Sequence, residues 1–251
     1  MFHLAFRQTE GLIGSIIGLL GLTLRLPDHT TMSRRAANLE VPRPQRHLGG
    51  SDAAPIHLLV DSTGLKLCGA GEWLVEKHGA KARRAWRKLH IGVDAGTGQI
   101  MASTLTTKEV DDGAQVGPLL AQLTDPLASF IGDGAYDQDV VYAAVAEPHP
   151  DAAVIVAPRA TAAPSPTADT APTQRDGHLR CIAETGRIGW QTSSGYNRRA
   201  KVETAIGRWK QVIGDGLRAH NDDCRATEVE VSAHVLNRML GLGRPSYVRI
   251  A

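Results

Sequence analysis

The sequence predicts an α/β protein in which helices flank a mixed sheet. Two observations carry this prediction: short apolar segments recur between residues 56 and 156, and helical patterns alternate with them from residue 112 onward. The resulting order, three strands followed by helix, strand, helix and strand, is typical of a sheet covered by helices. With 251 residues and 42% hydrophobic content, the chain is long enough to bury a substantial core.

The chain begins with a pattern that predicts a helix over residues 5–20, ended by Gly21. Its apolar stretch, Gly11 to Leu24, is shorter than the roughly 20 residues that a membrane helix needs. Polar and charged residues flank the stretch where a signal peptide would have a basic start and a small-residue cleavage site. We therefore expect a buried amphipathic helix, no membrane association and a cytoplasmic protein.

A second short helix is predicted after Pro27, capped by Thr30 or Thr31 and carrying Arg34 and Arg35. Helix, turn and basic helix form a candidate helix-turn-helix remnant that contacts DNA, although ordinary helical hairpins are at least as common. Prolines and glycines between residues 40 and 55 predict a linker. We accordingly expect two parts, an N-terminal helical segment and linker at 1–50 and a larger domain at 51–251.

The larger domain has a pattern of alternating strands and helices. The glycines of Asp94-Ala-Gly-Thr-Gly98 suit a hairpin between its second and third strands. A proline-rich stretch at 158–176 predicts a mobile loop. The predicted strands are 56–60, 88–93, 99–105, 128–131 and 152–156, and the predicted helices are 112–123, 137–146, 196–213 and 226–240.

Composition excludes several function classes. The 28 basic and 26 acidic residues give a net charge of +2, so any argument for a nucleic-acid partner must rest on local clusters. The three cysteines are far apart and lack metal-ligand spacing, which argues against a zinc ribbon or a disulfide framework and favours structural thiols. No HExxH, complete dinucleotide-binding or Gly-x-Ser-x-Gly motif is present.

Asp61 and Asp133 share one sequence context. Each follows a short apolar strand and precedes a turn that contains glycine. If the two strands are neighbours, the carboxylates would repel each other unless a cation lies between them, and oxygen ligands of this kind suit magnesium or manganese. The alternative for each residue alone is a turn-capping aspartate, which is common.

A third element lies on the helix predicted from Tyr196. Tyr196, Arg199, Glu203 and Lys210 occupy offsets 0, 3, 7 and 14, so they form one polar stripe at helical spacing. The apolar residues of the same segment offer a flank that packs on the sheet; they are Val202, Ala205, Ile206 and Trp209. The alternative is a surface ion pair between Arg199 and Glu203.

These segments resemble the three catalytic motifs of the DDE transposases of bacterial insertion sequences. The motifs are LLVDSTGLK at 58–66, IGDGAYD at 131–137 and YNRRAKVETAIGRWK at 196–210. The third segment matches the family's Tyr, Arg, Glu, Lys pattern at all four positions. RQTEG at 7–11 and PDHTTMSRRA at 27–36 extend the resemblance over most of the chain.

The resemblance implies a ribonuclease H-like fold and a metal-dependent DNA transposase. It places Asp61 on the first strand, Asp133 after the fourth and Glu203 on a late helix, where they would hold two divalent ions, Mg²⁺ with Mn²⁺ as a substitute. Water would first attack a phosphodiester at an element end, and the freed 3′-hydroxyl would then attack target DNA. Tyr196, Arg199 and Lys210 would contact DNA. The implied partners are element ends, target DNA and a second copy in a homodimer.

A basic run, Lys77 to Lys88, holds six Lys or Arg residues and no acid. Such a run suits sequence-independent phosphate contacts, while Trp86 suits stacking on an unpaired base. The alternative is a solvated charged loop. The predicted DNA-contacting residues of the run are Lys81, Arg83, Arg84, Trp86, Arg87 and Lys88.

Family members usually have a longer helical region before the point where this sequence begins, so we expect an N-terminally truncated transposase. Truncation puts recognition of element ends in question and leaves the three carboxylates in place. The alternative function is therefore a catalytically silent DNA-binding remnant.

Overall fold

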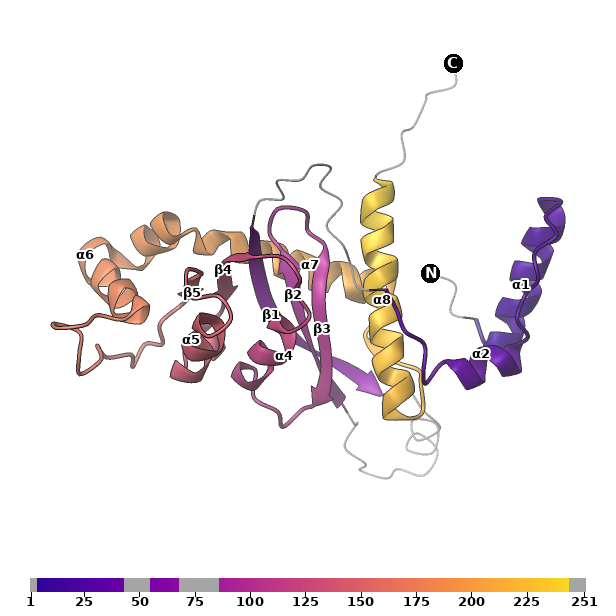
Figure 1. The fold of residues 1–251 in the computed structure, drawn as a ribbon, viewed down its shortest axis with the longest axis horizontal. Coiled ribbons are helices and arrows are strands. Elements are labelled where there is room, and N and C mark those ends of the chain that lie inside the picture. The colour runs from indigo at the N-terminus through magenta and orange to yellow at the C-terminus, as the bar shows by residue number, and fades with distance from the viewer. Residues whose placement is uncertain (1–3, 43–54, 68–85, 244–251) are drawn as a thin grey trace, which may run out of the picture.

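The computed structural model describes residues 4–42, 55–67 and 86–243. At its centre is a mixed sheet in the order β3-β2-β1-β4-β5, with β6 paired to the end of β1 (Figure 1). β1 is antiparallel to β2, and β2 to β3, whereas β4 is parallel to both β1 and β5. The strands are β1 (Ile56–Leu67), β2 (Trp86–Asp94), β3 (Ile100–Thr107), β4 (Leu127–Gly132), β5 (Ala153–Val156) and β6 (Gly216–Leu217).

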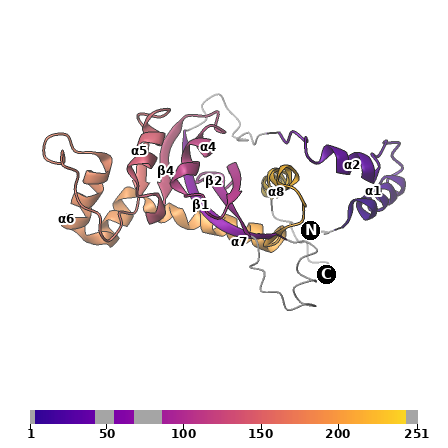
Figure 2. The ribbon, with the colours of Figure 1, turned by 90° about the horizontal axis from the view of Figure 1, so that it is seen from below.

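Helices cover both faces of this sheet, which confirms the α/β class (Figures 1 and 2). The described residues also form three short 3₁₀ turns: η1 (Gly113–Gln115) and η2 (Gly134–Tyr136), each between a strand and a helix, and η3 (Tyr196–Arg199), between α6 and α7. The helices are α1 (Phe6–Leu19), α2 (His29–Arg35), α4 (Val116–Leu120), α5 (Asp139–Ala146), α6 (Gln174–Ser194), α7 (Ala200–Val212) and α8 (Asp222–Leu242).

Alternation along β1 divides the core into two layers. Leu59 and Leu65 face the layer formed with α6, α7 and α8, while Leu58 and Val60 face the layer formed with α4 and α5. Because successive side chains of a strand point to opposite faces, β1 contributes to both layers and is buried between them. The odd-numbered residues of β1, which include Leu59, therefore point toward the side of the sheet that α7 covers.

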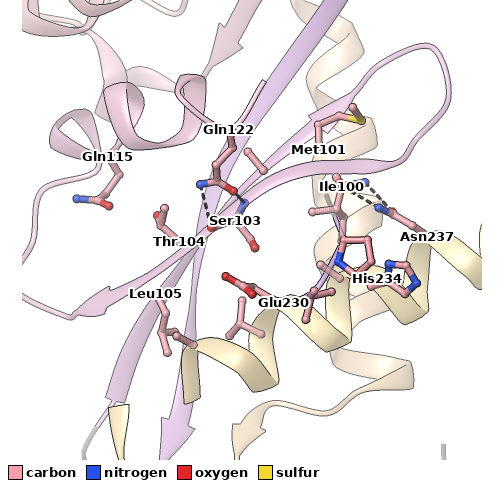
Figure 3. A pocket seen from close by; sticks show the side chains of 16 residues that line it. Ile100, Met101, Ser103, Thr104, Leu105, Gln115, Gln122, Glu230, His234 and Asn237 are labelled. Carbon is pink, nitrogen blue, oxygen red and sulfur yellow. Dashed lines mark hydrogen bonds between the residues drawn. The ribbon is translucent and has the colours of Figure 1, made fainter. Parts of the chain in front are cut away.

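Side-chain amides cover part of the outer edge of β3 (Figure 3). Asn237 of α8 accepts from the backbone N–H of Ile100 at 2.8 Å and donates to its carbonyl at 2.8 Å. Gln122 makes the same pair of bonds with the backbone of Ser103, each at 3.1 Å. An unpaired strand edge invites association with other strands, so these two amides protect the edge by mimicking a neighbouring strand.

The N-terminal helices differ from expectation in one respect. α1 ends near Gly21, which has a φ of 65°, as predicted, but no residue of α1 is buried. Its described tertiary partner is α2, and the two lie together beyond α8, apart from the sheet (Figures 1 and 2). The prediction of a buried helix was therefore wrong, because a single seven-residue helix is too small to cover the apolar side of α1.

The cap of α2 also differs from the prediction. Asp28, rather than Thr30 or Thr31, occupies the N-cap position, and its Oδ1 accepts from the backbone N–H of Thr31 at 2.7 Å. Arg34 and Arg35 lie in the last turn and are exposed. Their contact with DNA stays a prediction.

Three further elements refine the predicted order. The helix expected at 112–123 is shorter and consists of η1 and α4. In the β2–β3 turn, only Gly98 has a positive φ, 73°. The long helix α6 follows the proline-rich stretch and was not predicted. Across the described part of the chain, no helix combines the length and the hydropathy required to cross a membrane.

Candidate active site

Asp61 lies inside β1 rather than at its end. β1 continues to Leu67, so the prediction of a strand-end aspartate was wrong. Asp61 shares the parity of Leu59 and Leu65 and therefore points toward α7. Its Oδ1 accepts from the backbone N–H of Ser62 at 2.8 Å, and its side chain is 16% exposed. The central strand thus presents a fixed, mostly buried carboxylate to the α7 side of the sheet.

Asp133 follows β4, the parallel neighbour of β1. The register pairs Leu59 with Ile131, and continuing it by two residues brings Asp133 beside Asp61. Asp133 caps η2, with its Oδ1 accepting from the backbone N–H of Ala135 at 2.8 Å. Two adjacent strands therefore direct two carboxylates to the same place.

Glu203 comes from the first turn of α7. Val202, Ala205 and Trp209 are buried against the sheet, which confirms the predicted apolar flank. Lys201 donates to the carbonyl of Ala95 in the β2–β3 turn at 2.7 Å, which ties the first turn of α7 to the sheet. The position of Glu203 is thus set by the packing of the whole helix.

One guanidinium joins the three carboxylates. Nη2 of Arg199 lies 3.0 Å from Oδ2 of Asp61 and 3.6 Å from Oδ2 of Asp133, while Nη1 bonds to Oε1 of Glu203. Because both atoms lie near the same nitrogen, the distance between Oδ2 of Asp61 and Oδ2 of Asp133 cannot exceed the sum of these two distances. The structure brings together the residues that the three motifs identified.

Burial governs the electrostatics of this cluster. Desolvation raises the pKa of Asp61 above its usual value, although the Ser62 N–H and the Arg199 guanidinium oppose the rise. Burial alone would lower the pKa of Arg199, but Asp61 and its other anionic neighbours outweigh this effect and raise it. The cluster holds three carboxylates against one guanidinium, so it favours further positive charge.

The stripe predicted along one helix is divided between two elements. Tyr196 and Arg199 belong to η3, whereas Glu203 and Lys210 belong to α7. Tyr196 is half-buried near the carboxylates, whose charges contribute to raising its pKa after the larger effect of burial. Lys210 is exposed, two turns beyond Glu203. The structure therefore brings Tyr196 and Arg199 to the carboxylates and leaves Lys210 further along the helix.

The basic run lies only partly within the described residues. Lys81, Arg83 and Arg84 fall outside them. Trp86, Arg87 and Lys88 belong to β2, which begins two residues before the start predicted at residue 88. Arg87 pairs with Asp222 at 2.9 Å, and Lys88 pairs with Asp112 at 3.3 Å and donates to the Val110 carbonyl.

Trp86 also has an intramolecular environment. It is half-buried, and Lys66 Nζ lies 5.9 Å from the centre of its ring. Two cations and one aromatic ring of the run therefore contribute to the fold itself, and their contact with DNA stays a prediction.

A groove of about 510 Å³ lies elsewhere, between β3 and α8 (Figure 3). Ser103, Glu230 and His234 are among the residues that line it, and none of Asp61, Asp133 and Glu203 does. The carboxylate cluster is therefore separate from this groove.

Within the described ranges, no group of three or more His, Cys, Asp or Glu side chains is already arranged to hold a metal ion. The chemistry of the cluster nevertheless fits one, because carboxylate oxygens are the donors that magnesium and manganese prefer. Asp61 Oδ2 and Asp133 Oδ2 both face a cation, the Arg199 guanidinium. The arrangement is compatible with a metal once this guanidinium moves.

Sequence patterns missed the residues that support η3. His178 and Trp190 of α6 connect β5 to Tyr196 through hydrogen bonds and ring packing. Trp190 was the available signal in this mostly polar segment. A tryptophan there indicates a buried ring, and a buried indole N–H usually has a hydrogen-bond partner.

Comparison with known families agrees with this geometry. A family model described as "Transposase DDE domain" matches residues 52–238, and a second model with the same description matches residues 1–70. The first match covers more than half of the chain. The chain therefore belongs to the transposase DDE domain family, which confirms that the three motifs are those of a DDE transposase.

Two solved structures show a more distant likeness. The piggyBac transposase synaptic complex with hairpin DNA is 13% identical at a TM-score of 0.47, over 74% of this chain and 47% of that chain. The Mos1 transposase paired-end complex with the left transposon end is 12% identical at a TM-score of 0.29, over 90% of this chain and 71% of that chain. This chain spans about half the length of the piggyBac chain.

Proposed function

We propose that this transposase-family chain cleaves DNA and transfers strands, using divalent metal ions held by Asp61, Asp133 and Glu203. The observation that carries the proposal is the convergence of three carboxylates, from β1, the end of β4 and α7, on one guanidinium. Structural ion pairs seldom gather three anions around one cation whose side chain is only 18% exposed, because desolvation makes such an arrangement costly.

The residues have distinct roles in this proposal. Asp61, on the central strand, would hold the metal ions together with Asp133 and Glu203. Bound ions would activate the attacking oxygen and stabilise the leaving oxygen of an in-line displacement. Magnesium is the expected ion and manganese the expected substitute.

The chain's own cations would orient the DNA. Arg199 offers a planar donor fork that suits the bidentate binding of a phosphate, and Lys210 offers a point charge further along α7. Tyr196 lies beside Arg199 at the start of the same segment and is suited to contact the scissile strand. DNA ends, target DNA and a second copy of the chain are the proposed partners.

The proposal is tested by a plasmid-nicking assay with Mg²⁺ or Mn²⁺ on wild type and three variants, Asp61→Asn, Asp133→Asn and Glu203→Gln. Each variant should lose cleavage, whereas Asp61→Asn should bind DNA as well as wild type or better because a charge that repels phosphate is removed. Glu230→Gln is the matched control, an exposed acid of α8 outside the cluster. Cleavage by Asp61→Asn at the wild-type rate would refute the assignment.

A separate question is whether the segment of α1 and α2 takes part in reading element ends. We propose the boundary near residue 50 as the division between this segment and the catalytic domain. Competition between end-containing and scrambled duplexes at physiological salt tests whether this chain discriminates element ends. If this chain has no end-recognition unit, its affinity for end-containing duplexes should exceed that for scrambled duplexes by far less than the roughly 10³- to 10⁷-fold typical of specific sites.

A further inference from the structure

Arg199 occupies the position where a cation must lie to neutralise the candidate site. Its two terminal nitrogens face Asp61, Asp133 and Glu203 together, and its side chain is only 18% exposed. Nε of Arg199 is buried and has no hydrogen-bond partner among the residues that the structure describes. The guanidinium is therefore held by the three carboxylates and by little else.

A metal ion and this guanidinium need the same oxygens. Oδ2 of Asp61 and Oδ2 of Asp133 both face Nη2 of Arg199, at 3.0 Å and 3.6 Å. A divalent ion held by the two aspartates would lie close to this positive charge, and like charges at close range repel each other. Metal entry and the observed position of Arg199 therefore exclude each other.

DNA offers Arg199 an alternative anionic partner. Arg199 belongs to η3, a single 3₁₀ turn between the left-handed Gly195 and the start of α7. A guanidinium binds a phosphate through two parallel hydrogen bonds, so a DNA phosphate offers it a replacement for the carboxylates. Transfer of Arg199 to a phosphate would expose the three carboxylates at the moment when DNA is present.

We propose that Arg199 is an internal counter-ion that competes with divalent metal until DNA phosphate draws it away, so that DNA and metal bind cooperatively through this side chain. The inference rests on the proposed metal site and adds an order of events to it. Free protein would hold metal weakly, and DNA-bound protein would hold it tightly. Couplings of this kind typically change affinity by about 5- to 150-fold, and they act equally in both directions.

The test measures the dissociation constant of Mn²⁺ from its electron paramagnetic resonance signal, without DNA and with a short random-sequence duplex, after subtracting Mn²⁺ bound to duplex alone. Wild type, Arg199→Gln, Arg199→Lys and Arg198→Gln are compared. Arg198 is the matched control, an exposed arginine in the same turn. Thermal melting of each variant establishes that it is folded.

Without DNA, Arg199→Gln should bind Mn²⁺ about 5- to 150-fold more tightly than wild type, and Arg198→Gln should match wild type. Arg199→Lys should fall between them, because its ammonium contacts fewer oxygens at once. Addition of duplex should tighten Mn²⁺ binding in wild type and change it little in Arg199→Gln.

Equal or weaker Mn²⁺ binding by Arg199→Gln would overturn the inference. A parallel titration of Asp61→Asn distinguishes this failure from failure of the proposed function. If Asp61→Asn loses a site that wild type and Arg199→Gln hold equally, the metal site stands and the counter-ion role falls. If neither wild type nor any variant binds Mn²⁺ through Asp61, both proposals fall.

Discussion

The indole Nε1 of Trp190 donates a hydrogen bond to Nδ1 of His178 over 3.0 Å. Nδ1 must then be an acceptor, so the ring carries its proton on Nε2, which lies 2.8 Å from the carbonyl of Val154 in β5 and donates to it. The ring of Trp190 also packs against that of Tyr196, with 5.1 Å between centroids. A continuous set of contacts thus runs from β5 to the turn that carries Arg199.

Replacement of Trp190 by Phe should lower the free energy of unfolding by about 1–3 kcal/mol beyond the loss due to ring size, because His178 loses its donor inside the protein. Urea denaturation measures this loss. Trp209→Phe is the control, since Trp209 is also fully buried and its ring nitrogen has no bond within the described residues. Equal losses in the two variants would show that the hydrogen bond contributes nothing.

A pair of glycine substitutions tests how tightly the end of β4 is packed. A Cβ added at Gly132 would lie 2.8 Å from Cδ2 of the buried Tyr136, whereas one added at Gly117 in α4 meets nothing within 4 Å. Gly132→Ala should therefore cost about 1–3 kcal/mol by overpacking and should reduce cleavage, because Asp133 is the next residue. Gly117→Ala should stabilise the protein by about 0.4–1 kcal/mol.

Chemical denaturation of both variants measures these opposite changes in the free energy of unfolding. The Gly117 variant serves as the control for the general effect of Gly→Ala on the unfolded chain. A neutral or stabilising Gly132→Ala would show that Tyr136 moves aside freely and that Asp133 is not fixed by this contact.

The fold and the three carboxylates were predictable because each depends on local pattern. Apolar runs before Asp61 and Asp133 identified β1 and β4, and helical spacing from Val202 to Trp209 identified α7. α6 gave no such signal, since it contains Gly177, Gly186 and Gly189, is mostly polar, and is kinked at Gly186, where φ is 74°.

The partners of individual charges were not predictable for a different reason. Arg87 pairs with Asp222, 135 residues away, and Arg199 reaches Asp61 across 138 residues. No local periodicity encodes such contacts, because they arise only when the sheet and helices have packed. A run of like charges therefore identifies candidates for DNA binding without showing which of them the fold already uses.

Substitutions can distinguish the residues of the basic run that bind DNA from those that stabilise the fold. Arg83→Ala with Arg84→Ala should weaken binding to all duplexes alike and flatten the dependence of log affinity on log salt, by about one unit of slope for each phosphate that the variant no longer neutralises. Arg87→Ala should instead lower stability by up to about 1 kcal/mol, because Arg87 forms an ion pair with the exposed Asp222. Fluorescence anisotropy at several salt concentrations and urea denaturation measure the two effects. A loss of binding confined to one DNA sequence would instead make Arg83 and Arg84 specificity residues.

The buried His90 predicts a pH dependence of stability. Its side chain is fully buried on β2, with Nε2 2.9 Å from Oγ1 of Thr106 and Nδ1 3.3 Å from Oδ1 of Asp112. Burial lowers the pKa of His90 from 6.5 to about 4; Lys88 adds to this effect and Asp112 opposes it. Between these two pH values the unfolded chain binds a proton that the folded chain does not, so the free energy of unfolding rises with pH.

The stabilising contribution of neutral His90 should therefore be complete above about pH 6.5 and should be lost as the pH falls toward 4, by about 3 kcal/mol at most. Urea denaturation of wild type and His90→Gln between pH 4.5 and 7.5 measures this contribution. Subtracting the two free energies of unfolding removes the effect of the groups that titrate in both proteins. This difference should increase with pH and level off near neutrality. His234→Gln, an exposed histidine of α8, should show a difference from wild type that does not follow this rise. A pH-independent difference for His90→Gln would mean that His90 accepts a proton in the folded protein as readily as in the unfolded chain, with Asp112 compensating fully for its burial.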